Sequence, residues 1–316
     1  MYVNFVYIPY ILALAVKLQR PNIKRKLAVK MTKFSWDIIQ KQSDEILSCG
    51  LNKLKTQMFC DTSTVNEKGF GNYLISLDTV PFYVGEGKEL IKRLKQQFKP
   101  TTSTFYKNFE KLNSTNQLAK PTTIDKFKIQ FISTNIGRKE VEEFGIVNLP
   151  TKLNGFQLDK RKRFCIADQK GLWNAVQENF SKILEEGEIE ILKSTFTSWF
   201  DVKIISSAGL YLVKDKSNKL IYIGESSDIG ERIKTHSGRT YFSALRRHIG
   251  TEILGFELQE IKGKKRYFSE IEDRKVTEFL KTCKLTLFPV AFGRYELEEY
   301  LIKKHRPLLN RKDNKN

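Results

Sequence analysis

Cysteine and histidine are both scarce in this chain of 316 residues. It has four cysteines and three histidines, with no Cys-x-x-Cys pair and no histidine beside a cysteine. A structural zinc site needs about four closely spaced ligands of these types, and a disulfide framework needs a dense set of cysteines. We therefore expect neither, and we expect a protein of the reducing cytoplasm.

Glycine and proline are also sparse, at 18 and 8 residues, while 40% of the residues are hydrophobic. These values exclude a fibrous or low-complexity protein and are typical of a folded one. A chain of this length is long enough to form two or three domains.

Acidic residues are few relative to basic ones. Lysine and arginine number 55 against 36 aspartates and glutamates, which leaves a formal charge of +19. This balance favours a polyanionic partner, and nucleic acid ranks ahead of an anionic membrane surface. A solvated, lysine-rich surface from a biased genome composition would give the same numbers.

The amino-terminal stretch is apolar almost throughout from Tyr2 to Val16, and six basic residues follow it without an acid. The run is shorter than the roughly 20 residues that span a bilayer, and a secretory signal would carry its positive charges before the apolar run. We expect neither, and a membrane partner is not expected. Met31 opens an ordinary helical pattern, so we interpret it as the functional start and residues 1–30 as an extension of little consequence.

Two parts of the sequence are related to each other. GRYELEEYLIKKHRPLLN at 293–310 aligns with GRKEVEEFGIVNLPTKLN at 137–154 without a gap and with eight identities in 18 positions. Upstream, IYIGESSDIGERIK at 221–234 aligns with FYVGEGKELIKRLK at 82–95, and GLYL at 209–212 aligns with GNYL at 71–74. Three blocks in the same order predict a tandem duplication.

The predicted organisation follows from these blocks. It comprises an N-terminal extension and helical region (1–67), a first unit (68–156), a basic and helical connector (157–205) and a second unit (206–316). The connector begins with the basic stretch 160–163, which contacts phosphates or is solvated, and continues into an amphipathic helix over 172–184.

Both units predict the same elements. Residues 210–213 and 220–223 are short β-rich runs around a turn at 215–218, which predicts a hairpin, and 71–76 with 81–85 repeat it. A helix then begins near Ser227 or Asp228, and a later helix over 296–304 ends before Pro307.

The second unit contains the residue types that phosphodiester hydrolysis requires. The reaction needs a base, a cation against the phosphoryl oxygens and a carboxylate that holds a divalent metal. Tyr211 and Tyr222 come from the two strands, Arg232 from the first helix and Glu298 from the later helix. Tyrosine has a reference pKa of about 10, so nearby cations must favour its phenolate if it serves as the base. One carboxylate per site indicates a single, largely hydrated Mg²⁺ or Mn²⁺.

These residues resemble the GIY-YIG nuclease family. Gly209 and Tyr211 match its first signature, Tyr222 and Gly224 match its second, and Arg232 matches its helix arginine. The resemblance covers nearly the whole second unit. It implies an α+β fold with a small three-stranded antiparallel sheet flanked by helices, and one-metal hydrolysis of nucleic-acid phosphodiesters.

The resemblance also implies three further site residues. His236 is similar to a histidine of many homing and restriction members, Glu298 to the metal-binding glutamate, and Asn310 to the closing asparagine. We include all three in the predicted catalytic set, with Glu298 as the metal ligand.

The first unit repeats the pattern with two departures. Asn72 replaces the apolar residue of the first signature, and Gln97 stands at the position of His236. Because glutamine cannot take a proton, this copy is expected to be slow or inactive, although repair-type members of the family also lack the histidine. The predicted site of this unit consists of Tyr73, Tyr83, Arg93, Glu142 as its metal ligand, and Asn154.

Each of these residues also has an ordinary structural interpretation. Hairpin tyrosines usually pack across strands, Arg232 could pair with Asp228 on its own helix, and a helix glutamate usually faces solvent. The recurrence of one polar set in both units favours the catalytic interpretation.

The predicted function is a Mg²⁺-dependent, type II restriction-like DNA endonuclease with two nuclease units in one chain. Double-stranded DNA is the expected partner, a cognate methyltransferase is a second candidate partner, and no small-molecule cofactor is expected. The stretch from Lys262 to Phe268 mixes basic and aromatic residues, which predicts a DNA-contacting element. The alternatives are a repair or mobile-element nuclease that nicks DNA with one active unit, and a non-catalytic DNA-binding module with relic sites.

Overall fold

The computed structural model describes residues 34–65, 68–115, 118, 122–155, 169 and 171–310. Two predictions lie outside these residues: Met31 as the functional start, and phosphate contacts from the basic stretch 160–163. Among the described helices, none is long and apolar enough to cross a membrane.

The first sheet has the predicted three strands, in the order β2-β1-β3 and all antiparallel. The predicted hairpin is formed by β1 and β2, and its register pairs Tyr73 with Gly85. The elements of this region are β1 (Gly71–Leu77), β2 (Val80–Gly87), α5 (Leu90–Gln97), α6 (Thr104–Ser114), η1 (Ile124–Lys126), β3 (Lys128–Ser133) and α7 (Arg138–Asn148).

The second sheet has four strands rather than the predicted three, in the order β4-β9-β5-β6. The extra strand, β4 (Thr197–Ser198), is only two residues long and pairs with the edge of β9 (Lys284–Pro289). Its residues precede the motif blocks, so the sequence pattern gave no sign of it. The hairpin itself is β5 (Gly209–Lys214) and β6 (Leu220–Ser226), as predicted.

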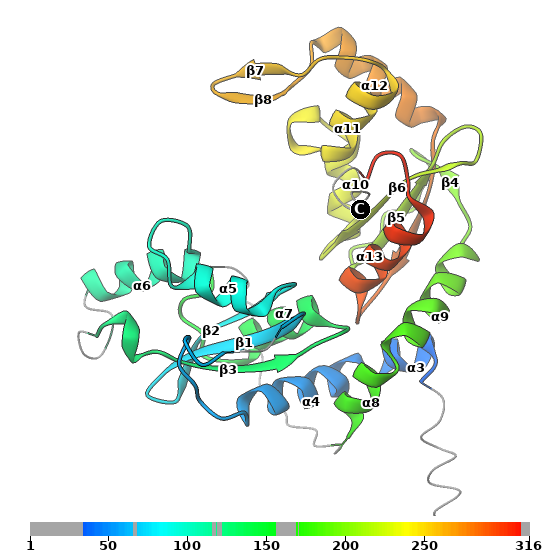
Figure 1. The fold of residues 1–316 in the computed structure, drawn as a ribbon. Helices are drawn as coiled ribbons and strands as arrows, with labels where there is room; N and C mark the ends of the chain where they lie inside the picture. The colour runs from blue at the N-terminus through cyan, green and yellow to red at the C-terminus, as the bar shows by residue number, and fades with distance from the viewer. Residues whose placement is uncertain are drawn as a thin grey trace, which may run out of the picture.

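Helices follow this hairpin as expected. Asp228 caps α10 (Ile229–Ser237) by accepting a hydrogen bond from the backbone N–H of Glu231, so it is the cap residue between the two candidates. The remaining elements are η3 (Thr240–Phe242), α11 (Ala244–His248), the π-helical η4 (Ile249–Ile253), β7 (Gln259–Ile261), β8 (Lys264–Tyr267), α12 (Glu270–Thr282) and α13 (Arg294–His305). Strands β7 and β8 form a separate hairpin that projects from the end of the molecule (Figure 1).

Two pairs of helices precede the sheets. The pair α3 (Trp36–Lys41) and α4 (Ser43–Lys55) comes before the first sheet, and α8 (Leu172–Glu178) with α9 (Phe180–Leu192) comes before the second. The connector helix expected over 172–184 is therefore two helices that meet at Asn179. These four helices run along one side of the crescent that the two sheets form (Figure 1).

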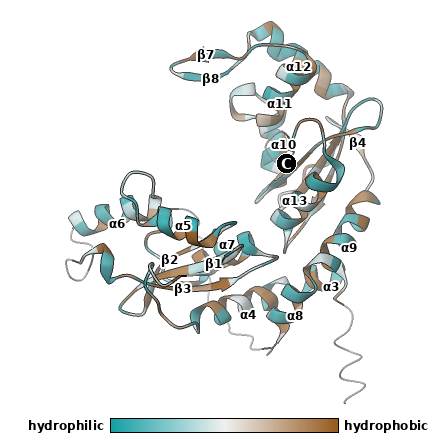
Figure 2. Ribbon diagram, viewed as in Figure 1, coloured by the Kyte–Doolittle hydropathy of each residue, from teal (hydrophilic) through white to brown (hydrophobic). Residues whose placement is uncertain are grey.

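The two helix pairs make matching contacts. An added Cβ at Gly50 would lie 2.5 Å from the ring of Trp173, and one at Gly187 would lie 2.7 Å from the ring of Trp36. Each glycine thus lets an indole of the other pair lie directly on its helix backbone. Both tryptophans belong to one hydrophobic core that includes buried residues from both sheets. Hydrophobic and hydrophilic residues are mixed along the helices α4, α8 and α9 (Figure 2).

Two glutamines cap loops of the opposite sheet in the same way. Gln40 of α3 accepts from two successive N–H groups of the β9–α13 loop and donates to the carbonyl of Phe292. Gln177 of α8 accepts from two successive N–H groups of the β3–α7 loop and donates to the carbonyl of Ile136. The two halves of the chain are therefore tied together reciprocally.

The centre of the molecule is a reciprocal ion-pair network between α7 and α13. Arg138, the first residue of α7, pairs with Glu296 of α13 at 2.8 Å, and Arg294, the first residue of α13, pairs with Glu140 of α7 at 3.1 Å. All four side chains are buried. The first residue of each helix thus contacts the third residue of the other helix. This is the pattern of a two-fold, self-complementary interface.

Candidate active site

The two tyrosines of the second unit lie side by side on neighbouring strands. The register of β5 and β6 places Tyr211 opposite Gly224, and the ring centroids of Tyr211 and Tyr222 are 6.0 Å apart. A Cβ at Gly224 would lie 2.3 Å from the Tyr211 hydroxyl. The glycine of the second signature therefore makes room for the tyrosine of the first.

His236 links Tyr211 to a serine that the sequence reasoning missed. The Tyr211 hydroxyl is 2.8 Å from Nε2 of His236, and the Ser243 hydroxyl is 2.6 Å from Nδ1. Ser243 is also the N-cap of α11, where its side chain accepts from the backbone N–H of Arg246. The position of Ser243 three residues before Arg246 is typical of a helix cap, but nothing in the sequence pointed to a contact with His236.

Burial is the main cause of the unusual pKa of His236. The imidazole is fully buried, and this, together with the charges of Arg232, Arg246 and Arg247, lowers its pKa to about 3. A neutral imidazole has one donor and one acceptor nitrogen. In the tautomer that carries the proton on Nδ1, the ring donates to Ser243 and Nε2 accepts from the Tyr211 hydroxyl.

Arg232 and Glu298 both act on the Tyr211 hydroxyl. Burial raises the pKa of Tyr211 well above its usual range, Tyr222 adds to the rise, Arg232 opposes it and Glu298 contributes a smaller rise. The cation expected to favour the phenolate is thus present, but burial outweighs its effect. Three predicted side chains therefore interact with Tyr211 of β5: Tyr222 of β6, Arg232 of α10 and Glu298 of α13.

The Arg232 guanidinium has an unused donor. Its Nε is buried and has no hydrogen-bond partner among the residues that the structure describes. Asp228 was the alternative partner considered for Arg232. Its carboxylate instead caps α10 and accepts from the hydroxyl of Ser206 at 2.6 Å. A buried N–H of this kind suits an anionic ligand, because an unpaired donor is costly.

Glu298 is half-buried on α13 and is held by the neighbouring strand. Its Oε1 accepts a hydrogen bond from the backbone N–H of Glu225 at 2.9 Å. No cluster of three or more metal-ligating side chains occurs in the described part of the chain. The donor set fits a hard divalent cation that binds through one carboxylate and otherwise through water and phosphate oxygens.

The two closing asparagines bind the backbone of a neighbouring strand, and their predicted catalytic role stays a prediction. Asn310 accepts from the N–H of Ile223 at 2.9 Å and donates to its carbonyl at 2.7 Å, so both amide atoms bind the edge of β6. Asn154 makes the same two contacts with Val84 on β2, at 3.0 and 2.8 Å. Each contributes about 0.5–1.5 kcal/mol per hydrogen bond and fixes the strand that carries a site tyrosine.

The first unit has a similar arrangement with a glutamine at its centre. Tyr73 and Tyr83 stack at 6.2 Å, and the Gln97 amide lies 2.9 Å from both the Tyr73 hydroxyl and the Ser103 hydroxyl. Ser103 caps α6 as Ser243 caps α11. Arg93 opposes the burial-driven rise in the pKa of both tyrosines.

Glu142 has different surroundings from Glu298. It forms an ion pair with Lys139, three residues earlier on α7. The equivalent position of α13 is Tyr295, according to the alignment of 137–154 with 293–310. Burial raises the pKa of Glu142, and Lys139 opposes that rise.

A basic and aromatic surface adjoins the second site. Phe242, which is 68% exposed, packs edge-on against Tyr241, and Tyr241 stacks on Tyr267 of β8 at 5.0 Å. Lys264 of β8 donates to the Tyr241 hydroxyl at 3.0 Å. A pocket of about 630 Å³ connects this surface with the site and is lined by Arg232, Thr235, Gly238, Arg239 and Phe242.

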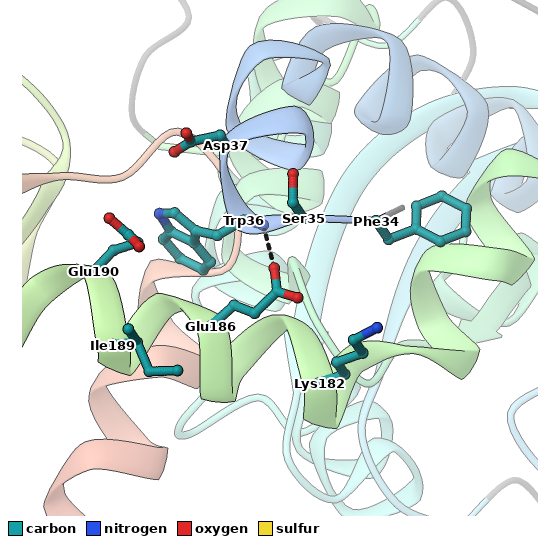
Figure 3. A pocket seen from close by; sticks show the side chains of 8 residues that line it. All are labelled: Phe34, Ser35, Trp36, Asp37, Lys182, Glu186, Ile189 and Glu190. Atoms are coloured by element: carbon teal, nitrogen blue, oxygen red, sulfur yellow. Dashed lines mark hydrogen bonds between the residues drawn. The ribbon is translucent and has the colours of Figure 1, made fainter. Parts of the chain in front are cut away.

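Another pocket, of about 370 Å³, lies between α3 and α9 and contains none of the predicted site residues. Here the backbone N–H of Trp36 donates to the carboxylate of Glu186 at 2.8 Å (Figure 3). The contact joins the two helix pairs, and we assign it a structural role.

Comparison with known proteins identifies one domain. Residues 195–316 match the GIY-YIG catalytic domain. No curated protein and no solved structure gives a significant match to the chain. The domain implies a nuclease, and the matched residues include Tyr211, Tyr222, Arg232, His236 and Glu298.

Proposed function

We propose that this protein is a divalent-metal-dependent DNA endonuclease whose working site is formed by Tyr211, Tyr222, Arg232, His236 and Glu298. The observation that carries the proposal is the meeting of a guanidinium with a buried, unused Nε and a half-buried carboxylate at one tyrosine pair. This combination provides an anion-binding donor and a metal-binding acceptor beside hydroxyl groups that take part in proton transfer.

DNA is the substrate that the surface favours. The chain carries a formal charge of +19, and the aromatic and basic surface at Phe242, Tyr241 and Lys264 adjoins the site. Aromatic side chains stack on bases, while lysines and arginines neutralise phosphates. The predicted contact element from Lys262 to Phe268 supplies part of this surface through β8.

In the proposed reaction, Arg232 donates from Nε to a nonbridging oxygen of the scissile phosphate. Glu298, oriented by the backbone N–H of Glu225, would hold the metal, which when bound stabilises charge on the leaving oxygen. Water attacks phosphorus, and the bond between phosphorus and the leaving oxygen breaks.

The proton of the attacking water leaves through the Tyr211 hydroxyl. Its oxygen accepts that proton while it passes its own proton to Nε2 of His236, 2.8 Å away. A bound phosphate offsets the charge of Arg232, one of the groups that lower the pKa of His236, so the imidazole becomes a better base when substrate is present. Ser243 holds the ring for this transfer.

We further propose that the chain is a tandem duplication that includes the helix pairs. The reciprocal contacts of Arg138 with Glu296 and of Arg294 with Glu140 support a two-fold relation between the units. The matching contacts of Gln40 and Gln177 support extending each repeat to α3–α4 and α8–α9. Each repeat would then begin at its helix pair, in place of a separate N-terminal region and connector.

A restriction-like role, with two working units and a cognate methyltransferase, is a proposal that rests on the sequence pattern alone. The alternative with one active unit gains support from Gln97, which cannot take a proton at the position of His236. The non-catalytic alternative conflicts with the complete set of polar groups in the second unit.

The test is cleavage of plasmid and genomic DNA by the full chain with Mg²⁺ or with a chelator. Wild type should cleave only with the metal, Glu298→Gln should lose cleavage, and Glu278→Gln, an exposed glutamate of α12, should behave as wild type. Discrete genomic fragments would support the restriction role, and a smear would oppose it. Binding without any metal-dependent cleavage would refute the nuclease proposal.

A further inference from the structure

The two glutamates at the predicted metal positions have different neighbours three residues earlier on their helices. In the first unit, Lys139 forms an ion pair with Glu142, and the two side chains are 28% and 8% exposed. In the second unit, the residue at the position of Lys139 is Tyr295, which carries no positive charge. The contact joins two residues that are three positions apart on α7 and therefore lie on the same side of the helix.

The Lys139 ammonium is held among several acidic groups. Its Nζ pairs with Oε2 of Glu142, and Glu143 and Glu86 add their negative charge nearby. Lysine has a reference pKa of about 10.4, so the ammonium is charged at neutral pH. A monovalent cation with three donors thus contacts the carboxylate that would otherwise be available to a metal.

The rest of this site can bind a phosphate but has no proton acceptor. Arg93 lies beside Tyr73 and Tyr83, and the pKa of each tyrosine is raised by burial. Gln97, in the place of His236, bridges Tyr73 and Ser103. With its oxygen turned toward Arg93, the amide also accepts from that guanidinium at 3.2 Å.

We propose that the first unit is a metal-free binding site for a DNA phosphodiester, in which the Lys139 ammonium takes the place of the divalent cation. The inference rests on the proposed function, since it takes the second unit as the metal-dependent one. Lys139 and Arg93 neutralise the phosphate, no water is activated, and the bond is not cut. One chain then grips DNA with its first unit and nicks it with its second.

The experiment counts metal sites and does not depend on cleavage. Mn²⁺ is titrated into the full chain without DNA and followed by electron paramagnetic resonance, which separates bound from free ion. Wild type should bind one Mn²⁺ per chain. Glu298→Gln should remove that site, and Glu142→Gln should leave it unchanged.

Removal of the ammonium should open a second site. Lys139→Met keeps the apolar stem, and Lys139→Tyr reproduces the residue of the second unit, so each should bind two Mn²⁺. Lys139→Arg keeps the charge and should bind one. Lys92→Met, a matched loss of charge from an exposed lysine of α5, should also bind one.

The outcomes separate the inference from the proposed function. Two Mn²⁺ in wild type, with one lost in Glu142→Gln, would overturn the inference and leave the function intact. One Mn²⁺ in both Lys139→Met and Lys139→Tyr would also overturn it. A wild-type site that survives Glu298→Gln and is lost in Glu142→Gln would refute both.

Discussion

At the residue scale, the glycine of the second signature is explained by a neighbouring strand. Gly224 lies opposite Tyr211, and its missing side chain leaves the space that the phenol occupies. Gly85 and Tyr73 show the same arrangement, with a Cβ-to-hydroxyl distance of 2.4 Å. The glycine of the second signature and the tyrosine of the first thus pack against each other, because any side chain at the glycine would clash with the phenol.

We predict that Gly224→Ala displaces Tyr211 and destabilises the fold. The added methyl would lie 2.3 Å from the hydroxyl, and overpacking of a core costs about 1–3 kcal/mol. Thermal unfolding should show a lower midpoint together with a loss of cleavage. Gly155→Ala, where the nearest side-chain atom is 4.0 Å away, should leave both unchanged, and an unaltered midpoint for Gly224→Ala would contradict the packing argument.

The buried imidazole of His236 makes stability depend on pH. An unfolded histidine has a pKa of about 6.5, whereas His236 has a pKa of about 3 in the folded chain. Below about pH 6.5 the unfolded state therefore binds a proton that the folded state excludes, and stability falls as the pH falls toward 3.

We predict that His236→Gln reduces this acid sensitivity, because its amide can bridge Tyr211 and Ser243 as Gln97 bridges its own partners. Urea unfolding at pH 7.5 and pH 5 should show a larger loss of stability for wild type than for the variant. Glu140, whose pKa is raised to about 7 by burial, titrates in both proteins and cancels in the comparison. Equal losses would mean that His236 is not held neutral.

At the element scale, most helices and strands of the two sheets could be predicted because their patterns are local. Alternating β-rich runs fixed the hairpins, and Asp228 and Pro307 marked the ends of helices. The break at Asn179 could not be predicted, because the apolar periodicity continues through it. The short β4 could not either, since it depends on pairing with β9, which lies far away in the sequence.

The interface between α7 and α13 was also invisible in the sequence pattern. Its arginines and glutamates account for several of the identities between residues 137–154 and 293–310. Arg294 pairs with Glu140, Glu143 and Glu225 and is buried. Residues that the two segments share thus form the contact between α7 and α13, in addition to those that take part in the proposed chemistry.

We predict that Arg294→Met destabilises the protein strongly. It leaves the buried carboxylate of Glu140 without its cation, and breaking a buried pair in this way costs about 3–5 kcal/mol. Lys193→Met removes an exposed ion pair with Glu190 and should cost about 0–1 kcal/mol. Urea unfolding measures both, and similar values for the two variants would contradict the role of the interface.

The surface beside the second site should contribute to DNA binding through stacking. We predict that Phe242→Ala weakens DNA binding by about 1–3 kcal/mol, the usual value for one base on an aromatic ring. Phe200→Ala, a phenylalanine that is 51% exposed and does not line the pocket, is the control. Fluorescence anisotropy with a labelled duplex measures both, and equal affinities would remove Phe242 from the contact surface.

At the scale of the whole molecule, local motifs indicate which side chains the fold brings together, but not every contact that these side chains make. Arg232 and Glu298 both interact with Tyr211, and their catalytic roles stay predictions. The backbone contacts of Asn310 and the contact of Ser243 with His236 were not predicted, since hydrogen bonds between distant segments leave no periodic signal. The contact of Lys139 with Glu142 was present in the sequence as an i, i+3 pair, but only burial gave it significance.

Together, the proposals assign different tasks to the two units of one chain. The reciprocal contacts between α7 and α13 join the units. We propose that the first unit, where Lys139 pairs with Glu142, binds DNA and that the second unit cleaves it. A two-fold frame with unequal sites suits an enzyme that orients on a duplex and cuts one strand per binding event.

The most direct test compares Glu298→Gln with Glu142→Gln on supercoiled plasmid in the presence of Mg²⁺. The account predicts that wild type and Glu142→Gln convert the plasmid to the open-circular form at similar rates. Glu298→Gln should bind the DNA but be slower by a factor of at least about 10², the usual effect of losing a group that stabilises transition-state charge. A Glu298→Gln variant that nicks as fast as wild type would contradict the central claim.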